Sequence, residues 1–180
     1  VVVVLLDEVG LAEQSPHLPL KVLHKLLDED REQAVVGISN WRLDPAKMNR
    51  AVHLYRQEPT VEDLALTAEG MVNSASLKGH LIGVAKSFSE VYRLQKKTDF
   101  WGMREFYSTV RSINAALGEA GQTLEPAVVM NAVLRNYGGR PDEIESVIGI
   151  FFGALSMGVQ GIRRPPVLEL AEQNIRASQE

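Results

Sequence analysis

The chain begins with an apolar run that ends in two adjacent carboxylates. Residues 1–6 read VVVVLL, and Asp7 and Glu8 follow directly. Such a run is typical of a strand buried on both faces of a parallel sheet, and ligands bind where such strands end. Because successive strand residues point to opposite faces, one acid would hold Mg²⁺ and the other would activate a water for attack on a phosphate. This is the Walker B pattern; the alternative is a strand end whose acids cap a loop.

A second apolar stretch also ends in polar residues. Residues 34–39 (AVVGIS) predict a neighbouring buried strand, and Asn40 lies at its tip, where an amide can bind the attacking water or the terminal phosphate. A short helix is predicted to start at Asp44-Pro45, with Asp as N-cap and Pro in the first turn. Arg50 follows, and it would stabilise charge on a phosphoryl transition state in a neighbouring module. Taken singly, Asn40 indicates a turn and Arg50 a solvated charge, but their order after the acids favours the functional interpretation.

Short strands and helices are expected to position these residues in the first third of the chain. Residues 10–19 predict a loop, and leucines at helical spacing predict a helix over residues 20–27, which the acidic run 28–30 helps to stop. Residues 51–55 alternate between apolar and polar, which predicts a third strand before Pro59. We expect this α/β region to end near residue 59.

The remainder of the chain predicts a helical bundle followed by a linker. Thr60 and Asp63 approximate a capping box at the start of the first helix. Apolar residues recur at helical spacing in the later segments. The predicted helices cover residues 60–72, 77–94, 100–117, 127–137 and 144–157, and the predicted linker covers residues 163–180.

Composition excludes several classes of site. Hydrophobic residues make up 45% and charged residues 23% of the 180 residues, as is typical of a globular protein. The net charge of −4 gives no electrostatic reason to expect nucleic acid or an anionic membrane as the main partner. Without cysteine, these residues hold no disulfide, zinc-thiolate site or catalytic thiol. No apolar run reaches the roughly 18 residues that span a bilayer. The first residue lies inside an apolar run and is not Met, so we expect a piece of a longer protein.

Four stretches carry a resemblance to a known family. They are DEVGLAEQSPHLPLKVLHKLLDED, GISNWRLDPAKMNRA, DFWGMREFYS and RNYGG, within residues 7–30, 37–51, 99–108 and 135–139. In this order they resemble one AAA+ unit of the mysterin family, giant vertebrate proteins that combine dynein-like AAA+ units with a ubiquitin-ligase region. The resemblance covers residues 1 to about 160. It implies an α/β fold, in which a partial AAA+ P-loop NTPase core with a parallel sheet over residues 1–59 precedes an all-α lid subdomain over residues 60–162.

The resemblance also implies roles for residues of the core. Asp7 corresponds to the acid that associates with Mg²⁺, and Glu8 to the catalytic base. Asn40 corresponds to the residue called sensor 1, which positions the attacking water. Arg50 corresponds to the arginine finger that acts in a neighbouring AAA+ unit, although two nearby arginines, at positions 42 and 56, are alternatives for this role.

A further arginine of the lid is expected to contact the bound phosphates as sensor 2. Arg135 and Arg140 flank the turn formed by Gly138 and Gly139, and both remain candidates. The family further implies the cofactors ATP and Mg²⁺, adjacent AAA+ units as partners and a cytosolic location. It also implies ubiquitin-protein transfer together with the ubiquitin machinery, through other regions of the longer protein.

One required part is absent from the sequence. A nucleotide site of this family needs the phosphate-binding loop G-x-x-x-x-G-K-[ST], and none occurs in the 180 residues. In the family the strand before that loop lies between the Asn40 strand and the strand expected at residues 51–55. These residues are therefore not expected to bind ATP well alone. Two alternatives remain open: a non-hydrolysing structural AAA+ unit, and a helical partner-binding module over residues 60–162.

Overall fold

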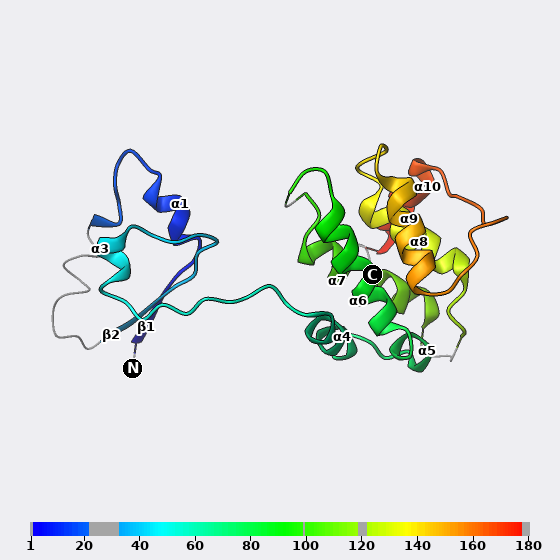
Figure 1. Cartoon of the computed structure of the whole chain (residues 1–180), viewed down its shortest axis with the longest axis horizontal. Helices are drawn as coiled ribbons and strands as arrows, with labels where there is room; N and C mark the ends of the chain where they lie inside the picture. Colours follow the sequence, from blue (N-terminus) through cyan, green and yellow to red (C-terminus); the bar gives the residue numbers. More distant parts are fainter. Residues whose placement is uncertain (1, 22–32, 99, 119–121, 178–180) are drawn as a thin grey trace. The chain divides into compact units, whose positions relative to one another are not determined.

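The chain divides into two compact units, Val1–Gln57 (unit 1) and Glu58–Glu180 (unit 2). The computed structural model, drawn in Figure 1, describes residues 2–21, 33–98, 100–118 and 122–177. The helix predicted over residues 20–27 and the acidic run 28–30 lie almost wholly outside the described residues. The division between the units lies next to the boundary expected near residue 59.

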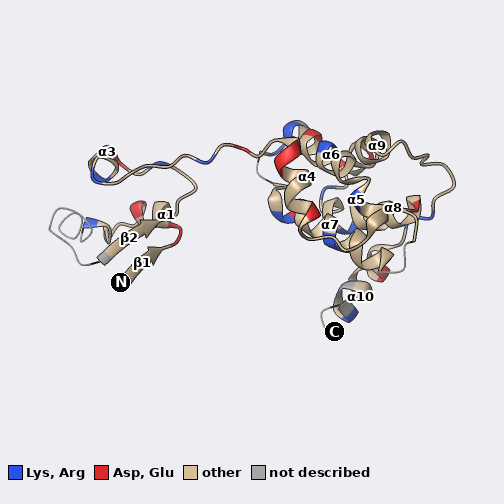
Figure 2. Ribbon diagram, turned by 90° about the horizontal axis from the view of Figure 1, so that it is seen from below, with Lys and Arg blue, Asp and Glu red and all other residues tan. Residues whose placement is uncertain are grey.

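Unit 1 contains a parallel pair of strands. Strand β1 (Val2–Leu6) pairs with β2 (Gln33–Gly37), and Val4 lies opposite Val35 in the register. Figure 2 shows the two strands side by side. The sequence prediction of two neighbouring parallel strands is confirmed, and both strands therefore end at the same edge.

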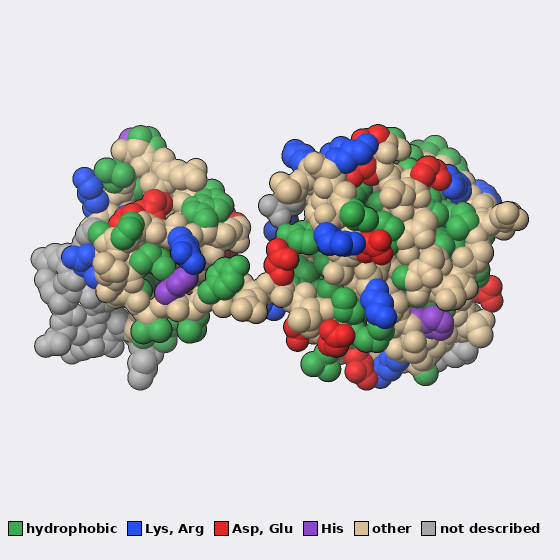
Figure 3. Space-filling view, in the orientation of Figure 1, with side chains coloured by type: hydrophobic (Ala, Val, Ile, Leu, Met, Phe, Trp, Pro, Cys, Tyr) green, Lys and Arg blue, Asp and Glu red, His purple; other side chains and the backbone are tan. Residues whose placement is uncertain are grey.

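The expectation that the first strand is buried on both faces is wrong. Val3, Leu5 and Val36 share one face of the strand pair, and their side chains are 56%, 61% and 47% exposed. Figure 3 shows hydrophobic side chains on the surface of unit 1. An uninterrupted apolar run is compatible with cover on two faces, but the described residues of unit 1 leave this face open.

Two short helices follow the strands. Helix α1 (Val9–Glu13) begins directly after Glu8, in a stretch that the sequence predicted as loop from residue 10 onward. Helix α3 (Pro45–Met48) begins as predicted, because Asp44 Oδ1 accepts hydrogen bonds from the backbone N–H groups of Ala46 (2.8 Å) and Lys47 (3.2 Å).

The third strand predicted over residues 51–55 is not formed. The segment is irregular, and Val52, Leu54 and Tyr55 are 90%, 87% and 71% exposed. A strand is stabilised by pairing with a neighbour, and no described residue pairs with this segment. Alternation of apolar and polar residues is therefore not sufficient to form a strand over residues 51–55.

Unit 2 is built from helices. They are α4 (Val61–Glu69), α5 (Ala75–Lys78), α6 (Leu81–Leu94), α7 (Met103–Leu117), α8 (Pro126–Tyr137), α9 (Ile144–Ala154) and α10 (Val167–Ala177). Helix α6 packs against α4 and α9, and α8 packs against α7 and α9. The capping box predicted at Thr60 is confirmed, since the Thr60 hydroxyl accepts from Asp63 N (3.1 Å) and Asp63 Oδ2 accepts from Thr60 N (3.0 Å).

Two predictions for unit 2 need correction. The helix expected over residues 77–94 is divided into α5 and α6, because Gly79, the residue with the weakest helix propensity after proline, ends α5. The linker expected over residues 163–180 contains helix α10, whose Leu170 is buried while Leu168 is 71% exposed. The segment is therefore helical, with one apolar side chain removed from solvent.

The core of unit 2 is a continuous hydrophobic cluster with aromatic side chains at its centre. Phe106 and Phe151 are completely buried, and the ring of Tyr137 lies 5.4 Å from that of Phe151 and 5.6 Å from that of Trp101. Burial raises the pKa of the Tyr137 hydroxyl far above its ordinary value of 10.0. Across the described residues, no helix has the length and apolarity needed to cross a bilayer.

Candidate functional site

The two acids lie in the turn that joins β1 to α1. Strand β1 ends at Leu6, so Asp7 and Glu8 follow the strand and do not occupy its alternating faces. Asp7 Oδ1 accepts a hydrogen bond from the backbone N–H of Glu8 (2.9 Å), and both residues are exposed. Glu8 has φ 51° and ψ 37°, a left-handed conformation that few residues other than glycine adopt. The backbone therefore changes direction sharply at Glu8, the predicted catalytic base.

Backbone hydrogen bonds hold this turn against the end of β2. The N–H of Ile38 donates to the carbonyl of Leu6 (2.9 Å), and the N–H of Val9 donates to the carbonyl of Ile38 (3.0 Å). Residue 38 is therefore bonded on both sides of the Asp7-Glu8 turn. These two bonds fix the acidic turn beside the segment that leads to Asn40.

Side chains on either side of Asn40 lie close to the first turn of α1, which directly follows the acidic turn. Ser39 Oγ donates to the carbonyl of Trp41 (2.6 Å), and the Trp41 N–H donates back to Ser39 Oγ (3.3 Å), which closes a tight bend around Asn40. A methyl group at Gly10 would lie 2.5 Å from both Ser39 Oγ and Trp41 Nε1. The first turn of α1 thus abuts the bend that carries Asn40, and the structure brings together the segments of the predicted acids and amide.

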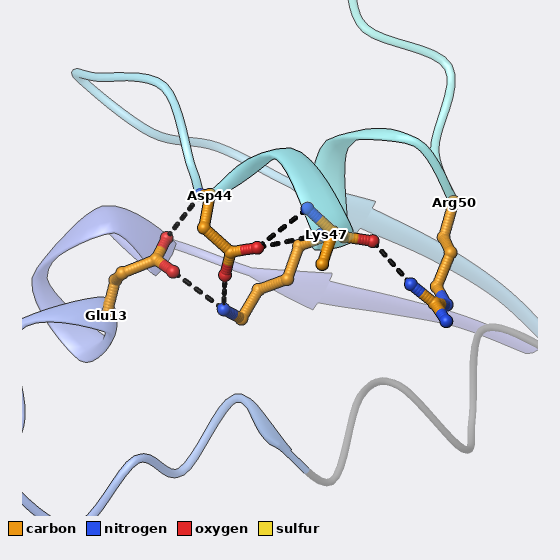
Figure 4. A network of polar contacts seen from close by, with 5 residues as sticks. Glu13, Asp44, Lys47 and Arg50 are labelled. Carbon is orange, nitrogen blue, oxygen red and sulfur yellow. Dashed lines mark hydrogen bonds and ion pairs between the residues drawn. The ribbon is translucent and has the colours of Figure 1, made fainter.

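Arg50 lies just beyond α3, the helix that the sequence predicted to carry it. Its Nη1 donates to the carbonyl of Ala46 (2.6 Å), so the guanidinium folds back along α3 (Figure 4). The side chain is exposed, as are those of the two alternative arginines, Arg42 and Arg56. Arg50 is thus hydrogen-bonded to α3. Its assignment as the arginine finger stays a prediction.

A polar network that sequence reasoning missed connects α1 with α3. Lys47 Nζ lies 2.6 Å from Glu13 Oε1 and also forms an ion pair with the Asp44 carboxylate, while the backbone N–H of Asp44 donates to Glu13 Oε2 (3.1 Å; Figure 4). The side chains of Lys47 and Glu13 are 13% and 22% exposed. The spacing of Asp44 and Lys47 is visible locally, but no sequence signal points to Glu13, which lies far from both along the chain.

The two candidate arginines of unit 2 differ in their surroundings. Arg140 Nη2 lies 2.9 Å from Glu143 Oε1, Arg140 Nε lies 3.3 Å from Asp142 Oδ1, and the guanidinium lies 5.2 Å from the centre of the Phe100 ring. The hydrogen bond with Asp142 raises the pKa of Arg140 above its ordinary value. Arg135, in the last turn of α8, is exposed. Arg140 is thus engaged within unit 2.

The residues of the turn fit a partial Mg²⁺ site. Mg²⁺ takes oxygen ligands and is usually bound by one or two carboxylates together with waters and substrate phosphates. Asp7 supplies an exposed carboxylate of this kind, with one oxygen already accepting the Glu8 N–H. Within the described ranges there is no group of three or more His, Asp or Glu residues able to hold a metal ion. Asp7 thus offers one oxygen ligand of the kind that Mg²⁺ takes, and its association with the metal stays a prediction.

Comparison with known proteins gives the relationships of the chain. Residues 1–63 match the family model described as RNF213 AAA domain. The chain is 36% identical over 188 residues to the E3 ubiquitin-protein ligase rnf213-beta of Danio rerio. It is 38% identical over 187 residues to the E3 ubiquitin-protein ligases RNF213 of Mus musculus and of Homo sapiens. Each match covers 96% of this chain and about 4% of the relative. No solved structure gives a significant match.

Proposed function

Because its first 63 residues belong to the RNF213 AAA domain family and nearly all of it resembles the RNF213 proteins, we propose that this chain is part of an AAA+ unit that binds and hydrolyses ATP. In this proposal Glu8 activates the attacking water, Asn40 positions that water, and Asp7 associates with Mg²⁺. The observation that supports it most directly is the hydrogen-bonded edge where the Asp7-Glu8 turn meets the segment leading to Asn40.

The proposed division of roles follows from the surroundings of each group. Glu8 is exposed and its backbone turns away from the strand, so its carboxylate can approach a water in front of the sheet edge. Mg²⁺ bound with ATP would neutralise phosphate charge during transfer, and Asp7 would be one of its partners. Arg50 acts in an adjacent AAA+ unit. That Arg135 or Arg140 contacts the phosphates stays a prediction.

The nucleotide site is proposed to be completed by residues outside this sequence. The phosphate-binding loop is absent from the 180 residues, and the described sheet has an open face and no strand beside residues 51–55. A strand leading to a phosphate-binding loop would supply both the loop and a pairing neighbour for residues 51–55. Ubiquitin-protein transfer, which the names of the relatives state for those proteins, would reside in other regions of the longer protein. The 180 residues contain no cysteine for a zinc-thiolate site or a ubiquitin-accepting thiol.

Substitution of Glu8 tests this function in the complete natural protein. Glu8→Gln keeps the shape of the side chain but removes the base, so ATP turnover is expected to fall by about 10²–10⁴-fold while nucleotide binding persists. The matched control is Glu90→Gln, at an exposed acid of α6 in unit 2.

The outcomes of this experiment separate the proposal from the structural alternative. Bound nucleotide retained by Glu8→Gln, measured by filter binding, together with lost phosphate release, supports the proposed base. Turnover in Glu8→Gln equal to that of the unmodified protein contradicts it. A complete protein in which this unit holds nucleotide but Glu8→Gln changes no measured rate would instead support a non-hydrolysing structural unit.

A further inference from the structure

The contact between α1 and α3 is formed around one half-buried cation. Lys47 is flanked by the carboxylates of Glu13 and Asp44, and its side chain is only 13% exposed. Glu13 uses both of its oxygens, one for the Lys47 ammonium and one for the Asp44 backbone N–H. A surface ion pair contributes little because solvent screens it and the side chains stay mobile, whereas this pair is shielded and shares a carboxylate with a backbone group.

Neither helix has much stability of its own. Helix α1 has five residues and α3 has four, far below the roughly 12–15 residues at which isolated helices become even marginally stable in water. Their positions are therefore set by the groups that tie them to the rest of unit 1. A pocket of about 220 Å³ lies beside the network, lined by Ala12, Leu18 and Leu20 among others, so apolar packing does not fill the space next to it. Glu13, the last residue of α1, accepts hydrogen bonds from Lys47 of α3 and from the backbone N–H of Asp44, the N-cap of α3.

Each helix lies next to one residue of the proposed reaction. Helix α1 begins directly after Glu8 and ends with Glu13, and α3 begins after Asp44 and is followed by Arg50, whose guanidinium is bonded to Ala46 of that helix. A continuous set of contacts therefore leads from the Glu8 turn, along α1, across Lys47 and along α3 to Arg50.

We infer that Glu13, Lys47 and Asp44 are positioning residues that fix α3, and with it the adjoining Arg50, relative to the turn bearing Glu8. This inference rests on the proposed function, in which Glu8 serves the site of this unit and Arg50 that of its neighbour. A displacement of the Glu8 turn on nucleotide binding or phosphate release would be carried through Lys47 to Arg50. The network thus links catalysis in one unit to the arginine offered to the next.

The first test measures the network without measuring activity. In the 180-residue chain, hydrogen exchange of the Asp44 backbone N–H is followed by NMR. Lys47→Met keeps the length of the side chain but removes its charge, and it is expected to speed exchange at Asp44 at least tenfold. Lys47→Arg, which keeps the charge, is expected to restore slow exchange. The control is Lys21→Met, at an exposed lysine that lines the same pocket.

The second test measures the consequence for ATP turnover in the complete natural protein. Lys47→Met is expected to lower kcat by tenfold or more and to leave KM for ATP unchanged, because a misplaced arginine finger weakens only the transition state. Lys47→Arg should recover most of kcat. The milder variant Glu13→Gln, which keeps an acceptor for the Asp44 N–H, should give a smaller decrease in the same direction.

The outcomes distinguish this inference from the proposed function. Unchanged exchange at Asp44 in Lys47→Met overturns the inference, whatever happens to turnover. Faster exchange with kcat unchanged shows a structural link that does not position Arg50, and it also overturns the inference. Failure of Glu8→Gln to lower turnover refutes the proposed function, while exchange at Asp44 still reports on the network.

Discussion

Units 1 and 2 place their apolar side chains in opposite ways. In unit 2 the helices enclose a continuous cluster in which Phe106, Ile113 and Phe151 have no exposed surface. In the described residues of unit 1, Val9 and Leu20 are the only buried hydrophobic side chains. The helical unit therefore carries its own hydrophobic stabilisation, whereas the unit with the candidate site leaves much of its apolar surface in water.

This difference shows how stability and chemistry are divided along the chain. Burial of apolar surface is the dominant favourable term in folding, and it scales with the area removed from water. Unit 2 gains from this term through its aromatic core. Unit 1 depends more on hydrogen bonds and ion pairs, such as those between Leu6 and Ile38 and between Glu13 and Lys47. The exposed apolar face of its strands could be covered by further packed elements.

The largest loss of stability should come from a substitution in the core of unit 2. A comparable substitution in unit 1 should cost much less. Phe106→Ala removes a completely buried ring and is expected to lower the free energy of unfolding of unit 2 by about 3–5 kcal/mol. Leu5→Ala removes a side chain that is 61% exposed and should cost less than about 1 kcal/mol in unit 1.

The two tryptophans allow these effects to be measured separately. The chain contains two, Trp41 in unit 1 and Trp101 in unit 2, so Trp41→Phe and Trp101→Phe backgrounds each report one unit by fluorescence during urea unfolding. Equal losses for Phe106→Ala and Leu5→Ala would contradict the contrast between the units.

A helix cap in unit 2 should have an intermediate effect. Thr60→Ala removes the hydroxyl that accepts from Asp63 N at the start of α4, and it is expected to cost about 1 kcal/mol. Thr60→Ser keeps the hydroxyl and serves as the control. Urea unfolding followed by Trp101 fluorescence measures both variants, and a loss in Thr60→Ser as large as in Thr60→Ala would show that the cap is not responsible.

The smallest effect should be a decrease in the stability of unit 2 at low pH. Hydrogen bonds from Arg140 and from Lys96 lower the pKa of Asp142 to about 2, from an ordinary value of 3.8. Since the folded pKa is the lower one, the stabilisation is present above pH ~4 and is lost as pH falls toward ~2. Asp142→Asn should flatten the decline of thermal stability in that window, measured at Trp101 in the Trp41→Phe background. If thermal stability declines equally in Asp142→Asn, other titratable groups cause the sensitivity to acid.

The features predicted correctly from sequence are those set by neighbouring residues. The Asp44-Pro45 start of α3 and the capping box of Thr60 and Asp63 depend on groups within three positions of one another, so their residue types reveal them. The parallel pair of strands also follows from two apolar runs that each end in polar residues. The segments carrying Asp7, Glu8 and Asn40 were expected at one sheet edge, and the structure brings them together there.

The features that sequence did not reveal depend on distant partners. Residues 51–55 alternate like a strand, but a strand also requires a neighbour, which alternation does not supply. Glu13 and Lys47 meet only through the tertiary fold of unit 1, and neither residue stands out among other charges in the sequence. Helix α10 lies in a segment whose composition predicted a linker, and the burial of its Leu170 was not visible from the sequence.

The exposed segment at residues 51–55 has a consequence for the behaviour of the chain in concentrated solution. Val52, Leu54 and Tyr55 project from a backbone that no described strand pairs with. Segments with exposed apolar side chains and unpaired backbone groups pair with similar segments of other molecules, which is how ordered aggregates begin. Association of molecules through residues 51–55 would therefore increase with protein concentration.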